Sequence, residues 1–302
     1  MIKASIDIGT NTVLLLVAEV GRNSLQVLRE EQRIPRLGQG VDDSGQLSDA
    51  AMQRVIAAVK EYQSLMDSQF DADIPLRLTA TSAVRDAQNR QQFSDRIKEE
   101  TGFDLEIVSG MEEAQLTFAG AKSMVRDQPD TQDVIIDIGG GSTEVAIGEG
   151  AQIFDRYSFD MGCVRYTERF LAHDPPTSDE LRRCCSAIRE MLQTYKFKLA
   201  KQVRLIGVAG TVTSLAYIDL GLTEYNSELL SGHHLTAEVI SAHIEAIQQQ
   251  TARELQAEHP VVMEGRADIF LAGLLILREF MTFYDFDHLV TSTGGIRHGA
   301  IL

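Results

Sequence analysis

The sequence predicts an α/β protein made of two related domains. Short β-rich runs alternate with amphipathic helical segments, which is the pattern of this class. A strand that ends at Asp7 and turns through glycine recurs at Asp137, an offset of 137 − 7 = 130 residues. That interval is too long for a solenoid repeat and fits a duplicated domain. The 302 residues, 44% of them apolar, suffice for two ordinary cores.

Each copy of the repeat predicts a β-hairpin with a polar, glycine-lined tip. Residues 5–12 read SIDIGTNT and residues 135–142 read IIDIGGGS, and each run continues as a second strand. A third strand-to-glycine turn, in RLIGVAGT at residues 204–211, leads into a helix. We expect the N-terminus of that helix to face the same cleft as the two hairpin tips.

The remaining elements follow from helical spacing and capping residues. Ser48 is a suitable N-cap for a helix over residues 48–66, and a strand over 74–81 precedes a helix that opens near Ser82. Residues 110–125 predict another helix. The polar stretch 126–133 marks a boundary between domains 1–128 and 129–302, with the last helix packing back on the first domain. Long helices are predicted over 177–199, 236–256 and 266–281.

The charge and the cysteines exclude several classes of protein. With 28 Lys and Arg against 44 Asp and Glu, the net charge is −16, which argues against a nucleic-acid or anionic-membrane partner. Three cysteines without CxxC spacing argue against a disulfide framework and a structural zinc site. The N-terminal segment lacks the features of a secretory signal, and no apolar stretch is long enough to span a membrane. We therefore expect a cytoplasmic protein.

The glycine turns have the composition of a phosphate cradle. Glycine lets backbone N–H groups approach a ligand closely, and neighbouring hydroxyls add donors. One such hairpin is explained equally well as a tight turn, but two copies and a third turn favour a phosphate site. The candidate residues are Gly9, Thr10, Thr12, Gly139, Gly140, Gly141, Ser142, Thr143, Gly210, Thr211 and Thr213.

Three carboxylates are candidates for binding Mg²⁺ or another divalent cation. Asp7 and Asp137 each come at a strand end just before the glycines, and Glu144 lies on the outgoing strand of the second hairpin. Mg²⁺ keeps several waters and needs only one or two acids besides substrate oxygens. Asx turns would also explain the two aspartates, and a solvated strand position would explain Glu144.

No Ser-His-Asp or Cys-His spacing indicates a covalent nucleophile. We therefore expect an acidic residue to act as the base that activates a water molecule. Phosphoryl transfer to water requires a group that orients or deprotonates the water, and a glutamate suffices. Glu112 and Glu113 are the candidates. The alternative is that this pair merely complements the dipole at a helix N-terminus.

These residues resemble the exopolyphosphatase and guanosine-pentaphosphate phosphatase family, within the actin, sugar-kinase and Hsp70 superfamily. The resemblance runs along nearly the whole chain and includes the pairing of an SGxEEA block with IDIGGGSTE. The matching segments, in order, are IDIGTNTVLLLV, TATSAVRDAQN, SGMEEAQLTFAGA, VIIDIGGGSTEVAIG, LIGVAGTVTSLA, RADIFLAGLLIL and STGGIRHGAI.

The resemblance implies two ribonuclease-H-like, actin-like domains flanking a cleft that hydrolyses the end of a phosphate chain with Mg²⁺. It implies that Glu113 is the general base, that Asp137 and Glu144 are metal-associated acids, and that Arg85 is a cation of the cleft. A homodimer is a further expectation. The phosphate-binding residues implied by the match are Gly9, Thr10, Asn11, Gly140, Gly141, Ser142, Gly210 and Thr211.

Two departures from the family pattern affect these expectations. Members commonly carry a basic residue just after the first turn, where this chain has Leu14. The chain also stops soon after the GGIRHG block, without the C-terminal HD-like extension of longer exopolyphosphatases. The resemblance therefore implies one fewer phosphate contact and a preference for shorter chains.

The substrate and three other functions stay open at this point. Polyphosphate and guanosine penta- or tetraphosphate present the same terminal phosphoanhydride. A sugar-kinase-like phosphotransferase would need an acidic base for the sugar. A sensor of polyphosphate or alarmone with little or no catalysis is favoured by Leu14, and an actin-like filament would need an exposed apolar insertion. A polyanionic substrate also requires local cations, for which the candidates are Arg33, Arg36, Arg85, Lys122, Arg165, Arg266 and Arg297.

Overall fold

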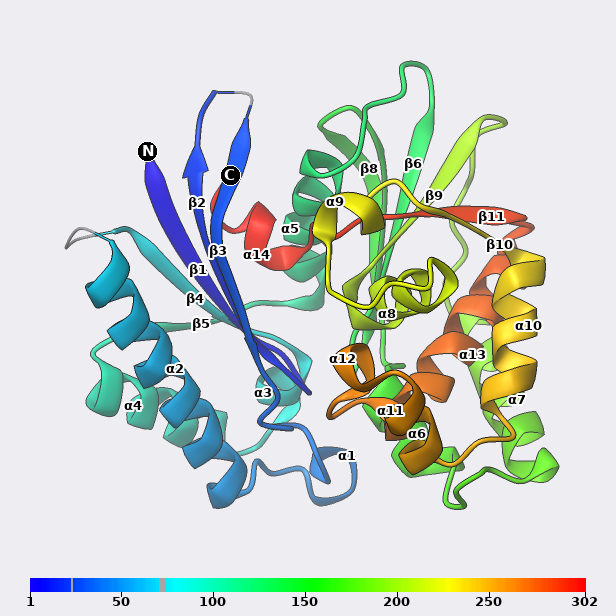
Figure 1. Cartoon of the computed structure of the whole chain (residues 1–302), viewed down its shortest axis with the longest axis horizontal. Coiled ribbons are helices and arrows are strands. Elements are labelled where there is room, and N and C mark those ends of the chain that lie inside the picture. The colour runs from blue at the N-terminus through cyan, green and yellow to red at the C-terminus, as the bar shows by residue number, and fades with distance from the viewer. Residues whose placement is uncertain (23, 71–73) are drawn as a thin grey trace.

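The computed structural model describes residues 1–22, 24–70 and 74–302 and confirms the α/β class (Figure 1). Its first sheet has five strands in the order β3-β2-β1-β4-β5. β1 pairs antiparallel with β2 and parallel with β4. The strands are β1 (Ile2–Ile8), β2 (Val13–Val20), β3 (Leu25–Arg33), β4 (Leu76–Ala80) and β5 (Leu105–Ile107).

The second sheet repeats this plan and adds one strand. Its order is β10-β11-β9-β6-β7-β8, and β6 pairs antiparallel with β7 and parallel with β9, as β1 does with β2 and β4. The repeat seen in the sequence is therefore a repeat of the whole sheet. The strands are β6 (Gln132–Ile138), β7 (Thr143–Glu149), β8 (Gln152–Phe159), β9 (Val203–Val208), β10 (His234–Thr236) and β11 (His288–Thr291).

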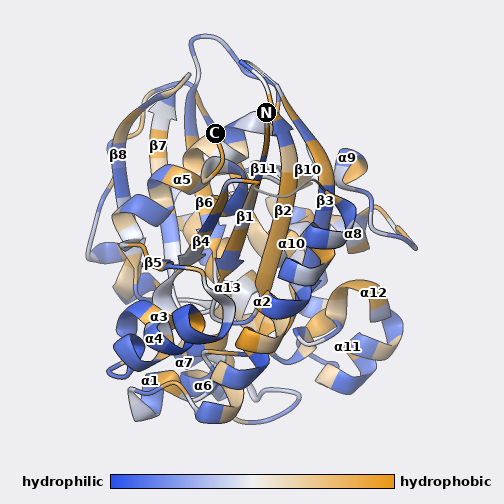
Figure 2. Ribbon diagram, turned by 90° about the vertical axis from the view of Figure 1, so that its left-hand side faces the viewer, coloured by the Kyte–Doolittle hydropathy of each residue, from blue (hydrophilic) through white to orange (hydrophobic). Residues whose placement is uncertain are grey.

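The central and edge strands differ in polarity. Most positions of β2 are buried, whereas every position of β3 is half-buried or exposed. Figure 2 shows the same contrast, with β2 largely hydrophobic and the edge strand β8 largely hydrophilic. Polar edge strands protect a sheet from pairing with another chain.

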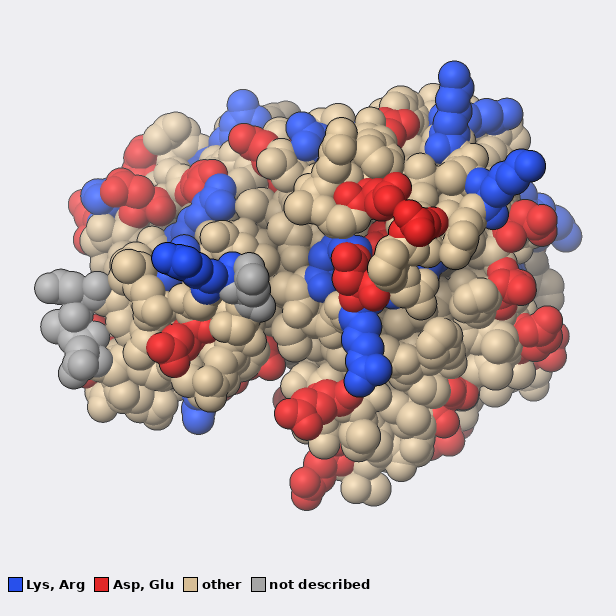
Figure 3. Space-filling view, turned by 90° about the horizontal axis from the view of Figure 1, so that it is seen from above, with Lys and Arg blue, Asp and Glu red and all other residues tan. Residues whose placement is uncertain are grey.

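Basic and acidic side chains are mixed on one face of the molecule. On the face shown in Figure 3, basic and acidic side chains lie interspersed over both halves of the molecule. Among the helices that the structure describes, none has the length and apolar character needed to cross a bilayer.

Helices α2 (Asp49–Gln69) and α4 (Arg90–Thr101) cover one face of the first sheet (Figure 1). The predicted N-cap is confirmed, because the Ser48 side chain accepts a hydrogen bond from the backbone N–H of Ala51. Val55, Ile56 and Val59 of α2 are fully buried in the core of this domain. Burial of each such side chain contributes roughly 1.5–3 kcal/mol. Short helices α1 (Val41–Ser44) and α3 (Ser82–Asp86) lie at the lower end of the sheet.

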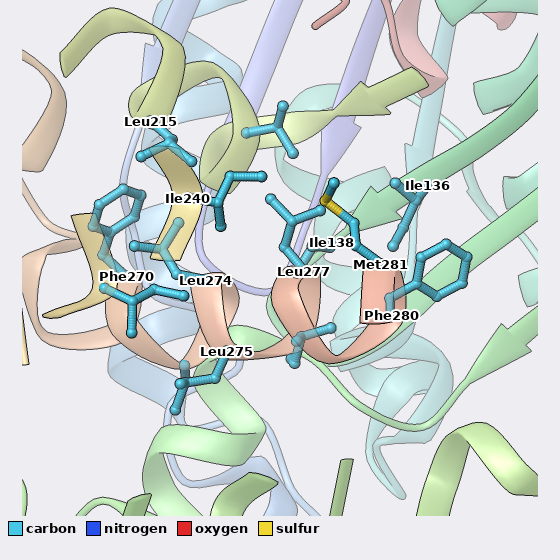
Figure 4. Packing of buried hydrophobic residues seen from close by; sticks show 14 of the residues in the cluster. Ile136, Ile138, Leu215, Ile240, Phe270, Leu274, Leu275, Leu277, Phe280 and Met281 are labelled. Carbon is cyan, nitrogen blue, oxygen red and sulfur yellow. The ribbon is translucent and has the colours of Figure 1, made fainter. Parts of the chain in front are cut away.

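Helix α13 (Ala267–Tyr284) forms the centre of the second core. Its residues Phe270, Leu274 and Leu277 belong to one buried cluster with Ile136 and Ile138 of β6 (Figure 4). The other helices of this half are α6 (Cys163–Phe170), α7 (Ser178–Gln193), α8 (Ala209–Asp219), α9 (Ser227–Leu230), α10 (Ala237–Ile247), α11 (Ala252–Glu258) and α12 (Pro260–Met263).

Two of the predicted long helices are shorter than expected. The helix predicted over 236–256 is two helices, α10 and α11, because Thr251 and Glu254 form a capping box that starts a new helix. The helix predicted over 177–199 ends at Gln193. Beyond it, the Tyr195 ring stacks on Tyr157 of β8 with centroids 4.2 Å apart, and this packing holds the chain out of the helix.

Two helices connect the halves. α5 (Gly110–Ser123) packs on the second sheet through Ala114 and Phe118, although it precedes residue 128, so the boundary at that residue stays a prediction. α14 (Ile296–Gly299) lies on the first sheet, and the Ser5 hydroxyl donates to the Arg297 carbonyl at 2.7 Å. A Cβ on Gly120 of α5 would overlap the backbone before α14, so these helices meet in direct contact.

Candidate active site

A cavity of about 600 Å³ lies between the two sheets. The tips of both hairpins and the β9–α8 turn line it, as the sequence predicted, together with Glu113 of α5. Parallel β1 and β4, and β6 and β9, all end at this cavity. Ligands of α/β sheets bind at such strand ends.

The register of the hairpins decides which carboxylates face each other. Asp137 is paired with Glu144 across β6 and β7, so the two side chains project from the same face of the sheet. At the equivalent positions of the first hairpin, Asp7 is paired with Leu14. The second hairpin thus carries two carboxylates at its tip, Asp137 in the cavity wall and Glu144 buried beside it, and the first carries one.

Each of the three acids receives a hydrogen bond from a neighbouring hydroxyl. Thr79 of β4 donates to Asp7 at 3.1 Å, and Thr117 of α5 donates to Asp137 at 3.1 Å. Ser158 of β8 donates to Glu144 at 2.6 Å. The second carboxylate oxygen of Glu144, Oε2, is buried, and no described residue makes a hydrogen bond to it within the usual geometric limits.

Burial dominates the acidity of this cluster. It raises the pKa of Asp7 to about 7, an effect partly opposed by Thr79 and increased by the Asp137 carboxylate. It also raises the pKa of Asp137 to about 6. Burial and then the Asp137 charge raise the pKa of Glu144 to about 7. Three carboxylates that ionise with difficulty favour a bound cation, because a cation compensates their charge.

Glu112 and Glu113, the acidic pair at the start of α5, have different environments. Glu112 forms a capping box with Ser109, which is the dipole-related role that the sequence allowed for the pair. Glu113 is only 8% exposed and accepts a hydrogen bond from Arg85 Nη1 at 2.9 Å. Burial and the Glu144 charge raise the pKa of Glu113 well above its usual range, against the opposing effect of Arg85.

The two glycine turns touch across the cleft. The hydroxyls of Thr10 and Ser82 lie 3.0 Å apart, and a Cβ on Gly140 would lie 2.7 Å from the Cβ of Thr10. Gly9, Gly139 and Ser142 also line the cavity. Gly141 packs against Ser82 at the back of this contact. The structure therefore brings the predicted phosphate turns together at one end of the cleft.

Asn11 and the third turn lie farther along the cavity. The Asn11 amide donates to the backbone carbonyl of Gly265 at 3.1 Å, so this side chain bridges the two halves. Ala209 has a φ of 65°, in the left-handed region that few non-glycine residues adopt. It turns the chain so that Gly210 and Thr211 follow at the start of α8, both in the cavity wall.

The structure shows which of the candidate cations reach the cleft. Arg266 and Arg297 line the cavity, and Arg85 contacts Glu113. The other four form ion pairs elsewhere: Arg33 with Glu61, Arg36 with Asp268, Lys122 with Asp133, and Arg165 with Asp86.

Several residues of the site were not predicted from the sequence. Thr117 lies one helical turn after Glu113, so its place on the same face of the helix was a usable signal. Thr79, Ser82 and Ser158 reach the site only through sheet pairing and domain packing, which leave no local pattern. In the described part of the chain, no three His, Cys, Asp or Glu side chains form a ready-made metal cage.

Comparisons with known proteins agree with this geometry. The sequence pattern of the Ppx/GppA phosphatase family matches residues 16–302. The chain is 35% identical to exopolyphosphatase 2 of Mycobacterium tuberculosis over 291 residues, covering 91% of this chain and 88% of that protein.

Solved structures give the same result. The Ppx/GppA family member of Aquifex aeolicus superposes with a TM-score of 0.83 at 29% identity, covering 100% of this chain and 96% of the other. An exopolyphosphatase from Cytophaga hutchinsonii superposes with a TM-score of 0.87 at 27% identity, with the same coverages. This chain is a member of the Ppx/GppA phosphatase family.

Proposed function

We propose that this protein is a Mg²⁺-dependent phosphohydrolase that removes the terminal phosphate of polyphosphate, of guanosine pentaphosphate (pppGpp), or of both. The observation that carries the proposal is the placement of Glu113, buried beside the phosphate turns and next to Glu144 and Asp137. The names of its relatives, which are exopolyphosphatases, support a phosphate chain as the substrate.

Glu113 acts as the general base toward the attacking water. Its pKa is raised, first by burial, which makes the carboxylate a stronger base than an ordinary glutamate. Arg85 holds the carboxylate in place through Nη1, and its charge favours the ionised form of Glu113. The backbone N–H groups of the glycine turns and the hydroxyls of Thr10, Ser82 and Ser142 bind the phosphate oxygens.

The acids of the two hairpins suit a divalent cation. The unpartnered Oε2 of Glu144 and the raised pKa values of Asp7 and Asp137 fit a hard cation with oxygen ligands. Asp7, Asp137 and Glu144 would hold Mg²⁺, through water or directly. When bound, Mg²⁺ supplies neutralisation of the phosphate charge.

A sensor of the same ligands is the second candidate function. It is favoured by Leu14, which places an apolar side chain in the cavity wall opposite Asp7. A lost phosphate contact can leave binding without efficient turnover. The homodimer stays a prediction.

The test is phosphate release with Mg²⁺ from tripolyphosphate, from long polyphosphate and from pppGpp. Glu113→Gln keeps the shape of the side chain and removes the base, so kcat should fall by about 10²–10⁴-fold. Glu112→Gln is the matched control, because Glu112 only caps α5. Unchanged release by Glu113→Gln would exclude Glu113 as the base. Binding of all three ligands by the wild type without release would support the sensor and make Leu14→Arg the next variant to test.

A further inference from the structure

An ion pair between the two halves of the molecule lies next to Arg85. Arg165 of α6 donates through Nη2 to Asp86 Oδ2 at 2.5 Å. Asp86 follows Arg85 at the end of α3, and its other oxygen, Oδ1, lies 3.8 Å from Arg85 Nε. That distance is close enough for the charges to attract but too long for a hydrogen bond. Asp86 therefore lies between two arginines and hydrogen-bonds Arg165.

Arg85 is thereby left for the proposed base. Its Nη1 donates to Glu113 Oε2 at 2.9 Å and to the Val108 carbonyl at 3.3 Å. Burial is the largest influence on the pKa of Arg85 and lowers it, but the Glu113 and Asp86 charges, among others, raise this pKa above its usual value. Asp86 and Glu113 are thus two carboxylates that compete for one guanidinium.

The position of Arg165 is fixed by the second phosphate turn. The backbone N–H groups of Val164 and Arg165 both donate to the Gly140 carbonyl, at 2.9 and 3.1 Å. The Arg165 side chain is only 15% exposed, and its Nη1 lies 3.5 Å from Asp42 of α1. Arg165 therefore carries a charge from the phosphate turn of the second half into contact with the first half.

A carboxylate pairs with a guanidinium in its reach, because charge-assisted hydrogen bonds are the strong ones. Resting on the proposed function, we propose that Arg165 is a positioning residue: by binding Asp86, it keeps Arg85 on the base. Without Arg165, the Asp86 carboxylate turns to Arg85 Nε and draws the guanidinium away from Glu113. The base is then misplaced, although the phosphate turns keep their contacts with the substrate.

The test measures kcat and KM for long polyphosphate in a double-mutant cycle. Arg165→Gln should lower kcat about 10-fold, because the base is displaced, and should change KM less than about threefold. Asp86→Asn removes the competing charge, so kcat of Asp86→Asn and of the double variant should lie within about threefold of the wild type. Such recovery shows that the loss comes through Asp86, since a general defect of folding would remain in the double variant.

Arg169→Gln is the matched control. Arg169 lies one turn farther along α6, and its ion pair is with Asp42 of α1, at 2.7 Å. Its removal also weakens the contact between the halves but leaves Asp86 paired, so kcat should change less than about threefold. A fall in kcat as large as that of Arg165→Gln would show that contact between the halves causes the loss, and would overturn the inference.

A crystal structure of Arg165→Gln tests the inference without any assay of activity. It should show Asp86 within hydrogen-bond distance of Arg85 Nε. An Asp86–Arg85 separation that stays at 3.8 Å would overturn the inference.

The two readouts separate this inference from the proposed function. If the wild type is active but Arg165→Gln has the wild-type kcat, or Asp86→Asn does not restore a lowered kcat, the inference is wrong and the function stands. If the wild type hydrolyses neither polyphosphate nor pppGpp, the function fails, and the crystal structure alone decides whether Asp86 moves to Arg85. Should Arg165→Gln unfold, Arg165→Lys replaces it in the same cycle. A kcat of Arg165→Lys that is unchanged, or that Asp86→Asn does not restore, would contradict the inference.

Discussion

The two hairpins share a backbone plan but differ in the residue opposite the aspartate. β1–β2 pairs Asp7 with Leu14, and β6–β7 pairs Asp137 with Glu144. The first hairpin thus contributes one carboxylate, and the second contributes two with an unpartnered oxygen. The two hairpins have the same backbone arrangement. The residue at one position of each outgoing strand, Leu14 or Glu144, decides how many carboxylates the hairpin contributes.

The largest expected effect is on catalysis by the second hairpin. Glu144→Gln removes a charge and a cation ligand without changing the shape of the side chain, so phosphate release should fall at least about 100-fold. Leu14→Gln places the same side chain at the equivalent position of the first hairpin and should change release less than about threefold. Assays of both variants across a range of Mg²⁺ concentrations check this. Equal losses of phosphate release in the two variants would show that the two hairpins do not differ in their contribution to catalysis.

A smaller effect is expected on packing. Gly140→Ala would bring a Cβ to 2.7 Å from Thr10 Cβ, whereas the Cβ of Gly9→Ala would come no nearer than 3.3 Å to any atom, the Thr12 carbonyl oxygen. Overpacking of this kind costs about 1–3 kcal/mol. Urea unfolding should therefore show a lower free energy of unfolding for Gly140→Ala than for Gly9→Ala. The reverse order would mean that the two turns do not approach each other as the structure shows.

The smallest effect is a shift of thermal stability with pH. The pKa values of Asp7, Asp137 and Glu144 are raised to about 7, 6 and 7, above those of the unfolded chain. Between pH 5 and 8 the native state then holds more protons than the unfolded state, so without divalent cations Tm should fall as pH rises. Added Mg²⁺ should raise Tm more at pH 8 than at pH 5.5, by a few degrees.

Variants in the two hairpins would show which acid causes this pH dependence of Tm. Glu144→Gln should flatten the fall of Tm and reduce the Mg²⁺ effect, whereas Leu14→Gln should leave both unchanged. Differential scanning fluorimetry with and without a chelator measures them. A Tm that rises with pH in the chelator would contradict the raised pKa values.

The sequence predicted those features of the fold whose signal lies within one short segment of the chain. The repeated Asp-Ile-Gly turns predicted both hairpins, and hairpin pairing placed Glu144 beside Asp137. Helical spacing alone was not a sufficient signal. The spacing over residues 236–256 predicted one helix, but the capping box at Thr251 divides this segment into two.

Contacts between distant segments could not be predicted. Arg36 and Arg266 are similar residues in sequence, but Arg36 forms an ion pair with Asp268, 232 residues away, and Arg266 faces the cleft. Such contacts depend on how the two halves pack, and no spacing in the sequence records that packing. The proposed roles of Glu113 and the metal-binding acids stay predictions until they are tested.

The return of the last residues to the first sheet has a consequence for biosynthesis. The Lys3 ammonium donates to the Ile301 carbonyl, and the Ser5 hydroxyl donates to that of Arg297, so β1 is held by residues that lie 298 and 292 positions later in the chain. On the ribosome, the cleft-facing side of this sheet stays uncovered until residue 301 emerges. A nascent chain from which residue 301 has not yet emerged therefore leaves Leu16 and Ala18, the apolar partners of Ile301, without this cover, and exposed apolar surface of this kind favours aggregation.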